Sequence, residues 1–540
     1  MTRYSKKEGF LSRLASRMPW HKSEPVNGYA SSVLNSVFAW VFWILCAVWF
    51  QSWIEDQELV AVFAIWGVYI AGLIYLRGSR VRVPIRSLLL FILALLFSLS
   101  LILNESYPIR NWTVFLLFIG FFVWRYDFAV IGGRRLNDEA LAAHLWNGAF
   151  KSSGAGVKTF FVSLYRGGEK GRGRRIGRTI GLICIGLAVA FIPTLIISLL
   201  LSYDSQFVDL MDRVFFFDDI FENLDVPLRD LFWGLPFAML MFAALFDAQR
   251  KNAMQKGEKV PTLSGARFAP RTLLCAAVTP ILLIYVIFFI SQWHYYMAAF
   301  THVLPENLTY AEYAREGFFQ LCTVCGINAV ILIIFRLCMK KDDLKKNDWV
   351  TRIYTMIISA FSLLLIATAL SKMLLYIRSY GLTQKRVYAS WFIILLAFIF
   401  TVVLIRQFFT RMQIAGILLV GGLCLSALIV FPNVDMMIAD YNVSAYLAGD
   451  LKDMDLDTLR ELGNSSVPAM LDLESTLKEK ENRTEKEEKL LASVGEYYLN
   501  PLAHRFRHQK QEFFSFNFTE AHARKLLADR PLPEHEQCNN

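Results

Sequence analysis

The stretch YASWFIILLAFIFTVVLIRQF at 388–408 decides the fold class, because its only charged residue, Arg406, lies near one end. A helix needs roughly 20 mostly apolar residues to cross a bilayer, where it must satisfy its own backbone hydrogen bonds. Similar runs recur along the chain and predict eleven membrane-spanning helices. They lie at about 33–53, 58–76, 86–103, 112–131, 179–201, 228–246, 272–297, 317–338, 353–376, 388–408 and 412–431.

The composition of the chain agrees with a polytopic membrane protein. Of 540 residues, 55% are hydrophobic and only 19% are charged, whereas soluble proteins are nearer a quarter charged. Disulfide scaffolds, nucleic-acid enzymes and disordered proteins are therefore excluded for the whole chain. The net charge of +10 does not indicate a nucleic-acid partner, because Lys and Arg are spread over short loops between the apolar runs.

The distribution of those cations predicts the topology. Lys and Arg in short loops are retained on the cytoplasmic side. The N-terminal segment 1–32 is basic, whereas the next loop, Glu55-Asp56-Gln57-Glu58, has no cation. We therefore expect a multi-pass protein of the cell membrane with a cytoplasmic N-terminus and, for an odd number of spans, an extracytoplasmic C-terminus. The loop 377–387 departs from this rule, because it carries three cations on the expected outer side.

Five regions follow from this pattern. They are the basic N-terminus 1–32, four spans in 33–131, a basic cytoplasmic loop 132–178, seven spans in 179–431 and an extracytoplasmic helical tail 432–540. The overall prediction is an all-α transmembrane bundle with a small C-terminal helical domain. Helical periodicity in the tail favours helices at 455–462, 467–477, 485–499 and 519–528, with breaks at Gly463, Pro468, Asn500-Pro501 and Arg530-Pro531.

The glycine-rich end of the basic loop has the composition of a phosphate-binding loop but not its motif. It has no Gly-Lys-Ser/Thr ending and no preceding strand. We instead expect the loop to hold anionic lipid at the cytoplasmic face, at about 1 kcal/mol per cation. The candidate residues are Arg172, Arg174, Arg175 and Arg178.

Three further patterns could indicate a metal or redox site, but we interpret each as a feature of the fold. The acidic stretch 202–227 also carries apolar residues at helical spacing, as an interfacial amphipathic helix does, with divalent-cation capture as the alternative. Cys322 and Cys325 lie inside an apolar run, where thiols act as packing groups. His504 and His508 have a spacing that can hold a metal, but no further motif surrounds them. We predict no catalytic residue, metal or cofactor.

Polar residues gather at the expected outer ends of the later helices. Charges at a bilayer are expensive and are often kept for pairing or function. These residues form either a vestibule or docking rim, or a set of loop residues that never meet. The candidate outer polar cluster comprises His294, Glu312, Arg315, Glu316, Lys372, Arg378, Tyr380, Lys385 and Arg386.

Several strings resemble the motifs of a bacterial integral-membrane family called domain of unknown function 4173. They are TYAEYAREGFFQL at 309–321, SYDSQF at 202–207, YGLT at 380–383 with Arg386, ADYN at 439–442, LRELG at 459–463 with VPAML at 467–471, and FNF at 516–518. The resemblance covers about 180–530 and implies a multi-spanning membrane protein without an established activity. Asn464-Ser465-Ser466 and Phe516 depart from the family pattern.

Two functions remain compatible with these observations. The first is a non-enzymatic envelope protein that acts as a signalling or assembly partner, with the tail facing an envelope protein or the cell wall. The alternative is a transporter or membrane-embedded enzyme that uses the outer polar cluster as its site. A deep polar cavity at the bilayer midplane would favour the alternative.

Overall fold

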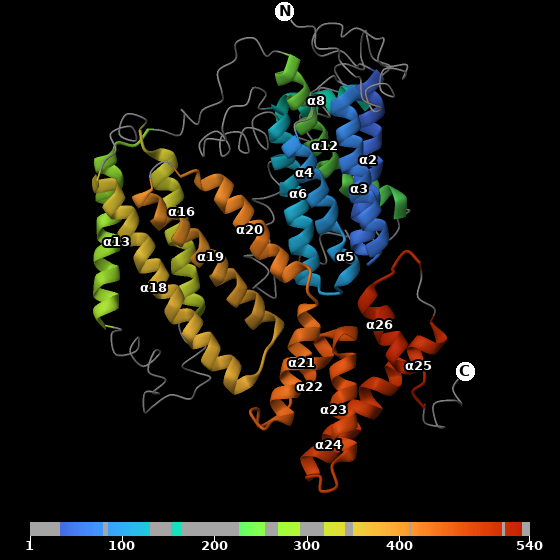
Figure 1. Ribbon diagram of the computed structural model, residues 1–540. Helices are drawn as coiled ribbons and strands as arrows, with labels where there is room; N and C mark the ends of the chain where they lie inside the picture. Colours follow the sequence, from blue (N-terminus) through green and yellow to red (C-terminus); the bar gives the residue numbers. More distant parts are fainter. Residues whose placement is uncertain are drawn as a thin grey trace, which may run out of the picture.

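The computed structural model describes residues 33–78, 85–129, 153–164, 226–253, 268–291, 318–340, 349–409, 412–509 and 513–531. Within these ranges the regular elements are helices, apart from one isolated bridge between Ala269 and Met339. The prediction of an all-α polytopic fold is therefore confirmed. Figure 1 shows two helical bundles side by side and a third group of helices at one end of both.

The first bundle has a dense apolar core. Its helices are α2 (Val33–Ile54), α3 (Glu58–Gly78), α4 (Ile85–Ser98), α5 (Ser100–Leu103), α6 (Tyr107–Ala129), α8 (Ser153–Leu164) and α12 (Val226–Ala253). The run expected as one helix at 86–103 is interrupted at Leu99. There the hydroxyls of Ser98 and Ser100 donate to carbonyls three residues back, at 2.7 and 2.8 Å, and such bonds compete with the helical ladder.

The second bundle is more open to its surroundings. It contains α13 (Arg271–Ser291), α16 (Phe318–Cys338), α18 (Trp349–Tyr380), α19 (Gln384–Phe408) and α20 (Ile414–Val430). Large aliphatic residues such as Ile287 and Ile333 face outward, as expected where lipid is the solvent. Inside, the buried Asn328 accepts from the Tyr285 hydroxyl at 2.5 Å and donates to Ser362 at 2.9 Å, so hydrogen bonds join α13, α16 and α18.

The C-terminal helices form the third group. They are α21 (Val434–Leu447), α22 (Leu456–Glu461), the 3₁₀ turn η4 (Gly463–Ser466), α23 (Val467–Glu479), α24 (Glu485–Val494), the π turn η5 (Gly495–Leu499), α25 (Asn500–His508) and α26 (Phe518–Leu527). The sequence did not predict α21. At the expected break Asn500-Pro501 the π turn η5 passes directly into α25, so an element boundary lies there but the backbone stays helical. Pro501 occupies the first turn of α25, where its missing N–H costs little.

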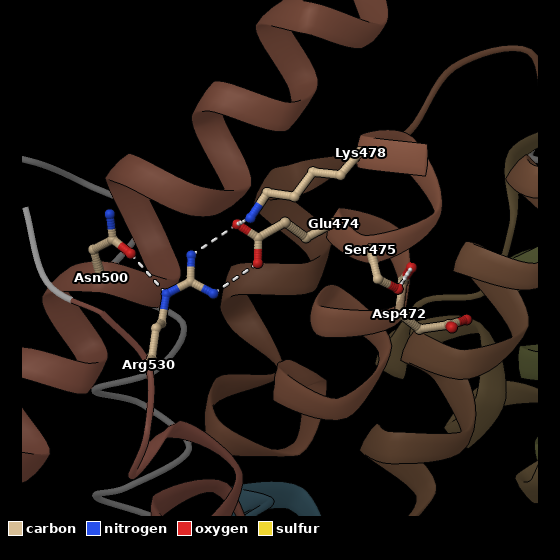
Figure 2. A network of polar contacts seen from close by, with 6 residues as sticks. All are labelled: Asp472, Glu474, Ser475, Lys478, Asn500 and Arg530. Atoms are coloured by element: carbon tan, nitrogen blue, oxygen red, sulfur yellow. Dashed lines mark hydrogen bonds and ion pairs between the residues drawn. The ribbon is translucent and has the colours of Figure 1, made fainter. Parts of the chain in front are cut away.

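A buried ion pair holds the C-terminal helices together. Arg530, which follows α26, contacts both carboxylate oxygens of Glu474 on α23 at 2.6 and 2.8 Å (Figure 2). Arg530 also donates to Asn500 at 2.7 Å, and Lys478 donates to Glu474 at 3.0 Å. Burial alone would raise the pKa of Glu474, but the hydrogen bonds from Arg530 and Lys478 outweigh it and lower that pKa.

Eight described helices are long and apolar enough to cross a membrane. They become nine if α20 and α21, which are bent by 57° at their break, are counted as one span. The expected span 179–201 lies outside the described residues. The expected span 86–103 is the shorter pair α4 and α5.

The C-terminal helices share one hydrophobic core with the first bundle. That core includes Phe97 and Leu101 near the end of α4 and α5, and Ile438 and Leu462 of the C-terminal group. Hydrogen bonds cross the same boundary, among them the one that Thr519 donates to the Leu103 carbonyl at 3.0 Å. Beside it, Asn104 donates to the carbonyl of Val430 at the end of α20, at 2.6 Å. We use the name junction for this boundary between the bundle ends and residues 434–531.

Candidate functional site

The turn between α18 and α19 is fastened to α21 by one asparagine. Asn442 accepts from the Leu382 N–H at 2.7 Å and donates to the Leu382 carbonyl at 2.8 Å. Gly381 beside it has a φ of +73°, and an added Cβ would lie 2.6 Å from the Asn442 oxygen. The turn therefore requires glycine both for its conformation and for its close approach to Asn442.

Arg386 closes the same turn from within the second bundle. Its guanidinium donates to the carbonyls of Tyr380 and Gly381 at 2.8 and 2.5 Å. It also lies over the ring of Tyr376, 4.1 Å from the ring centroid. The strings YGLT and ADYN, about 60 residues apart in sequence, therefore form one contact in the fold.

The other two C-terminal strings contact the end of the first bundle. Gly463 has a φ of +57°, and the next residue, Asn464, donates to Glu105 at 2.9 Å. Glu105 belongs to the turn between α5 and α6. Asn517 of the string FNF caps α26 by accepting from the Thr519 N–H at 2.8 Å, which places the Thr519 hydroxyl against Leu103.

A cavity of about 480 Å³ lies among these contacts, at the junction. Its walls come from the α2–α3 turn, the α5–α6 turn, the start of α19 and the C-terminal group. The lining residues are Glu55, Asp56, Glu58, Glu105, Ser106, Tyr107, Pro108, Arg110, Gln384, Asp435, Glu461, Leu462, Gly463, Ser515, Asn517 and Glu520. We call this space the junction cavity.

The junction cavity has a strong excess of acidic residues over basic ones. Seven of its lining residues are carboxylic acids and one, Arg110, is a cation, which pairs with Asp56. Burial raises the pKa of Glu105; the hydrogen bond from Asn464 opposes that rise, and the nearby Glu520 adds to it. Asp435 is buried and accepts from Gln384 at 2.9 Å. Because burial disfavours the charged form of these carboxylates, a positively charged group in the cavity would stabilise that form and be stabilised by it.

Side chains of types that can bind a metal occur at several positions among the described residues. They contain no group of three or more His, Cys, Asp or Glu arranged to hold a metal ion. The rings of His504 and His508 lie 4.4 Å apart. Cys322 and Cys325 are free thiols, and the buried Cys325 contacts the Ser362 carbonyl at 3.7 Å.

Only part of the predicted outer polar cluster falls within the described residues. His294, Glu312, Arg315, Glu316 and the lipid-binding candidates Arg172, Arg174, Arg175 and Arg178 lie outside them. Lys372 belongs to α18, while Arg378, Tyr380 and Lys385 are exposed at or near the α18–α19 turn. Tyr380 and Arg386 are in contact, and the neighbouring Gln384 lines the junction cavity. The cavity itself was missed, although acidic residues in short turns between apolar runs were its sequence signal.

A family model described as a domain of unknown function (DUF4153) matches residues 36–473. The chain belongs to the DUF4153 family. Its number differs from that of the family which the strings resemble, and the DUF4153 name likewise assigns no activity. The match also starts at residue 36 rather than near 180, so the first bundle is part of the DUF4153 unit. No curated protein and no solved structure matches the chain.

The Asn442 contact gives a direct test of how the DUF4153 chain is held together. We expect Asn442→Asp to lower the free energy of opening the 381–383 turn by about 1–3 kcal/mol, because aspartate cannot donate to the Leu382 carbonyl. Hydrogen exchange at Leu382 and Thr383 in the purified chain measures this. The same change at the exposed Asn482 is the control. Equal exchange in both variants would show that the contact does not hold the turn.

Proposed function

We propose that this chain is a non-enzymatic protein of a bacterial cytoplasmic membrane that acts as a signalling or assembly partner in the envelope. In this proposal residues 432–540 face the outside, and the junction cavity receives a positively charged group from an extracytoplasmic ligand or partner. The basic loop 132–178 holds anionic lipid at the opposite, cytoplasmic face.

The observation that carries the proposal is the position of the junction cavity between three parts of the chain. Glu105 comes from the first bundle, Gln384 from the second and Glu461 from the C-terminal group. A cation there would interact with all three parts at once. Its binding would therefore favour the arrangement of the two bundles in which these parts lie together. Residues of the strings at 459–463 and 516–518 also line this cavity, as does Gln384, which directly follows the string at 380–383. This arrangement supports its use as a site.

The orientation rests on the charges at the two ends of the first bundle. The α2–α3 turn at the junction carries Glu55, Asp56 and Glu58, whereas Arg77 lies at the opposite end of α3. Cations are retained on the cytoplasmic side, which supports an extracytoplasmic junction. Transport is less well supported, because the junction cavity lies at the helix ends rather than at midplane depth.

Spermidine is a suitable probe for the proposed site, because it is a soluble polycation that the cavity charges would attract. We expect it to raise the melting temperature of the full chain in detergent by a few degrees, and added salt to weaken the effect. The double variant Glu105→Gln, Glu461→Gln should lose at least half of that rise. Its glutamine at 105 still accepts from Asn464, so the fold should be retained.

The control for this experiment is Glu481→Gln, Glu488→Gln, which removes two exposed carboxylates outside the cavity. It should respond to spermidine like the original chain. Absence of any rise in the original chain, or equal rises in both double variants, would rule out the cavity as the place where a cation is received.

A further inference from the structure

A short aromatic loop precedes α26. In the segment Phe513-Phe514-Ser515-Phe516-Asn517-Phe518, the first two phenylalanines and the last are 72%, 58% and 55% exposed. Phe516 is different, because it packs against the shared core. Three outward phenylalanine rings within six residues form an apolar patch that water solvates poorly.

This aromatic loop lies at the level where the bundle helices end. Ser515 and Asn517 line the junction cavity together with Glu55 and Asp56 of the α2–α3 turn. Thr519, one residue after Phe518, contacts the carbonyl of Leu103 at the end of α5. In Figure 1 the loop turns toward the first bundle and reaches the level of its helix ends.

The same level marks the boundary of the lipid-facing surface. The last residues of α2, Trp53 and Ile54, are apolar and partly exposed, and Glu55 and Asp56 follow directly. The change from apolar to acidic residues at a helix end indicates the bilayer interface. The loop that carries the exposed rings therefore lies at the depth where the apolar surface of the first bundle ends.

We propose that Phe513, Phe514 and Phe518 insert into the interface of the bilayer leaflet on the side of the junction. Lipid is the occupant that fits, because it surrounds the bundle at this depth and buries aromatic rings without a shaped pocket. The loop thus fixes the C-terminal group to the membrane as well as to the bundle. This inference is independent of what the junction cavity binds.

Photo-crosslinking in a bilayer tests the inference. We would place p-benzoylphenylalanine at Phe513 or Phe514 in the full chain, in nanodiscs of phosphatidylethanolamine and phosphatidylglycerol. Both replaced rings are exposed, so folding is retained. After irradiation, mass spectrometry should find lipid adducts at these positions in at least about tenfold excess over Tyr497. That residue is 69% exposed and belongs to η5, which packs on α23, α24 and α25.

Ile284, an outward residue within α13, serves as the positive control for lipid contact. Lipid adducts at Ile284 but not at Phe513 or Phe514 would overturn the inference. Equal adduct yields at Tyr497 and in the loop would do so as well, because contact would then be non-specific. Adducts to a second protein chain in place of lipid would assign the loop to a protein interface.

Discussion

Replacing Arg530 by methionine is expected to destabilise the C-terminal helices by about 3–5 kcal/mol, because a buried carboxylate then loses its main partner. The side chains of Arg530 and Glu474 are only 12% and 8% exposed. Lys478, which remains, is largely exposed and neutralises Glu474 only in part. Hydrogen exchange of the α23 amides measures the loss without assuming that the whole chain unfolds in one step.

Two comparisons sharpen the Arg530 experiment. Lys489→Met removes an exposed ion pair with Glu485, for which we expect under about 1 kcal/mol. Adding Glu474→Leu to Arg530→Met should restore much of the lost protection, because no buried charge is left unpaired. If Arg530→Met and Lys489→Met have equal effects, the ion pair in Figure 2 does not hold the helices together.

The lowered pKa of Glu474 adds a dependence on pH. A carboxylate whose pKa is lower in the folded chain contributes stability above the ordinary glutamate pKa. That contribution is lost as the pH falls through the lowered value. The original chain should therefore lose protection in α23 on acidification beyond the ordinary glutamate range, and Arg530→Met should show a weaker dependence.

The second large effect is expected from Gly234→Ala in the first bundle. A Cβ at Gly234 would lie 2.5 Å from the backbone nitrogen of Ala47 and 2.6 Å from its Cα. Because the obstacle is backbone rather than a flexible side chain, α2 and α12 must move apart. The Trp43 indole, which donates to the Leu231 carbonyl at 2.7 Å, resists that movement. We expect a loss of about 3 kcal/mol.

The matched control is Gly422→Ala in α20, where an added Cβ meets nothing within 4 Å. Its stability should be unchanged or slightly raised, because alanine favours a helix over glycine. The measurement is the fraction of monodisperse chain left after heating in detergent. A Gly234→Ala chain as heat-resistant as Gly422→Ala would mean that α2 and α12 are not in backbone contact.

Several helices of the bundles were predicted from the sequence, because a helix that crosses a bilayer needs a long apolar run with polar residues at its ends. The run expected at 33–53 is α2 (Val33–Ile54), and the run at 388–408 falls within α19 (Gln384–Phe408). In contrast, α21 begins two residues after Pro432 and just beyond an apolar run. Because α21 mixes polar and apolar residues, its sequence does not differ clearly from that of a linker.

The junction cavity was not predicted, for a different reason. Glu105, Asp435 and Glu520 are far apart in sequence, and each looks like a solvated residue in its own segment. Their common location depends on which turns face one another, and that depends on packing such as Asn104 against Val430. Within the predicted outer polar cluster, Arg386 lies two residues after Gln384, a lining residue of the cavity.

The bond between Thr519 and Leu103 has a consequence for the order of synthesis. The two residues are 416 positions apart, and Asn104 and Val430 are 326 apart. A ribosome completes α5 long before it makes either distant partner. The junction end of the first bundle therefore lacks these two contacts while the later helices are synthesised and inserted. Contacts of such long range form late in folding. Closure of the junction is therefore a completion step that only a fully synthesised and inserted chain reaches.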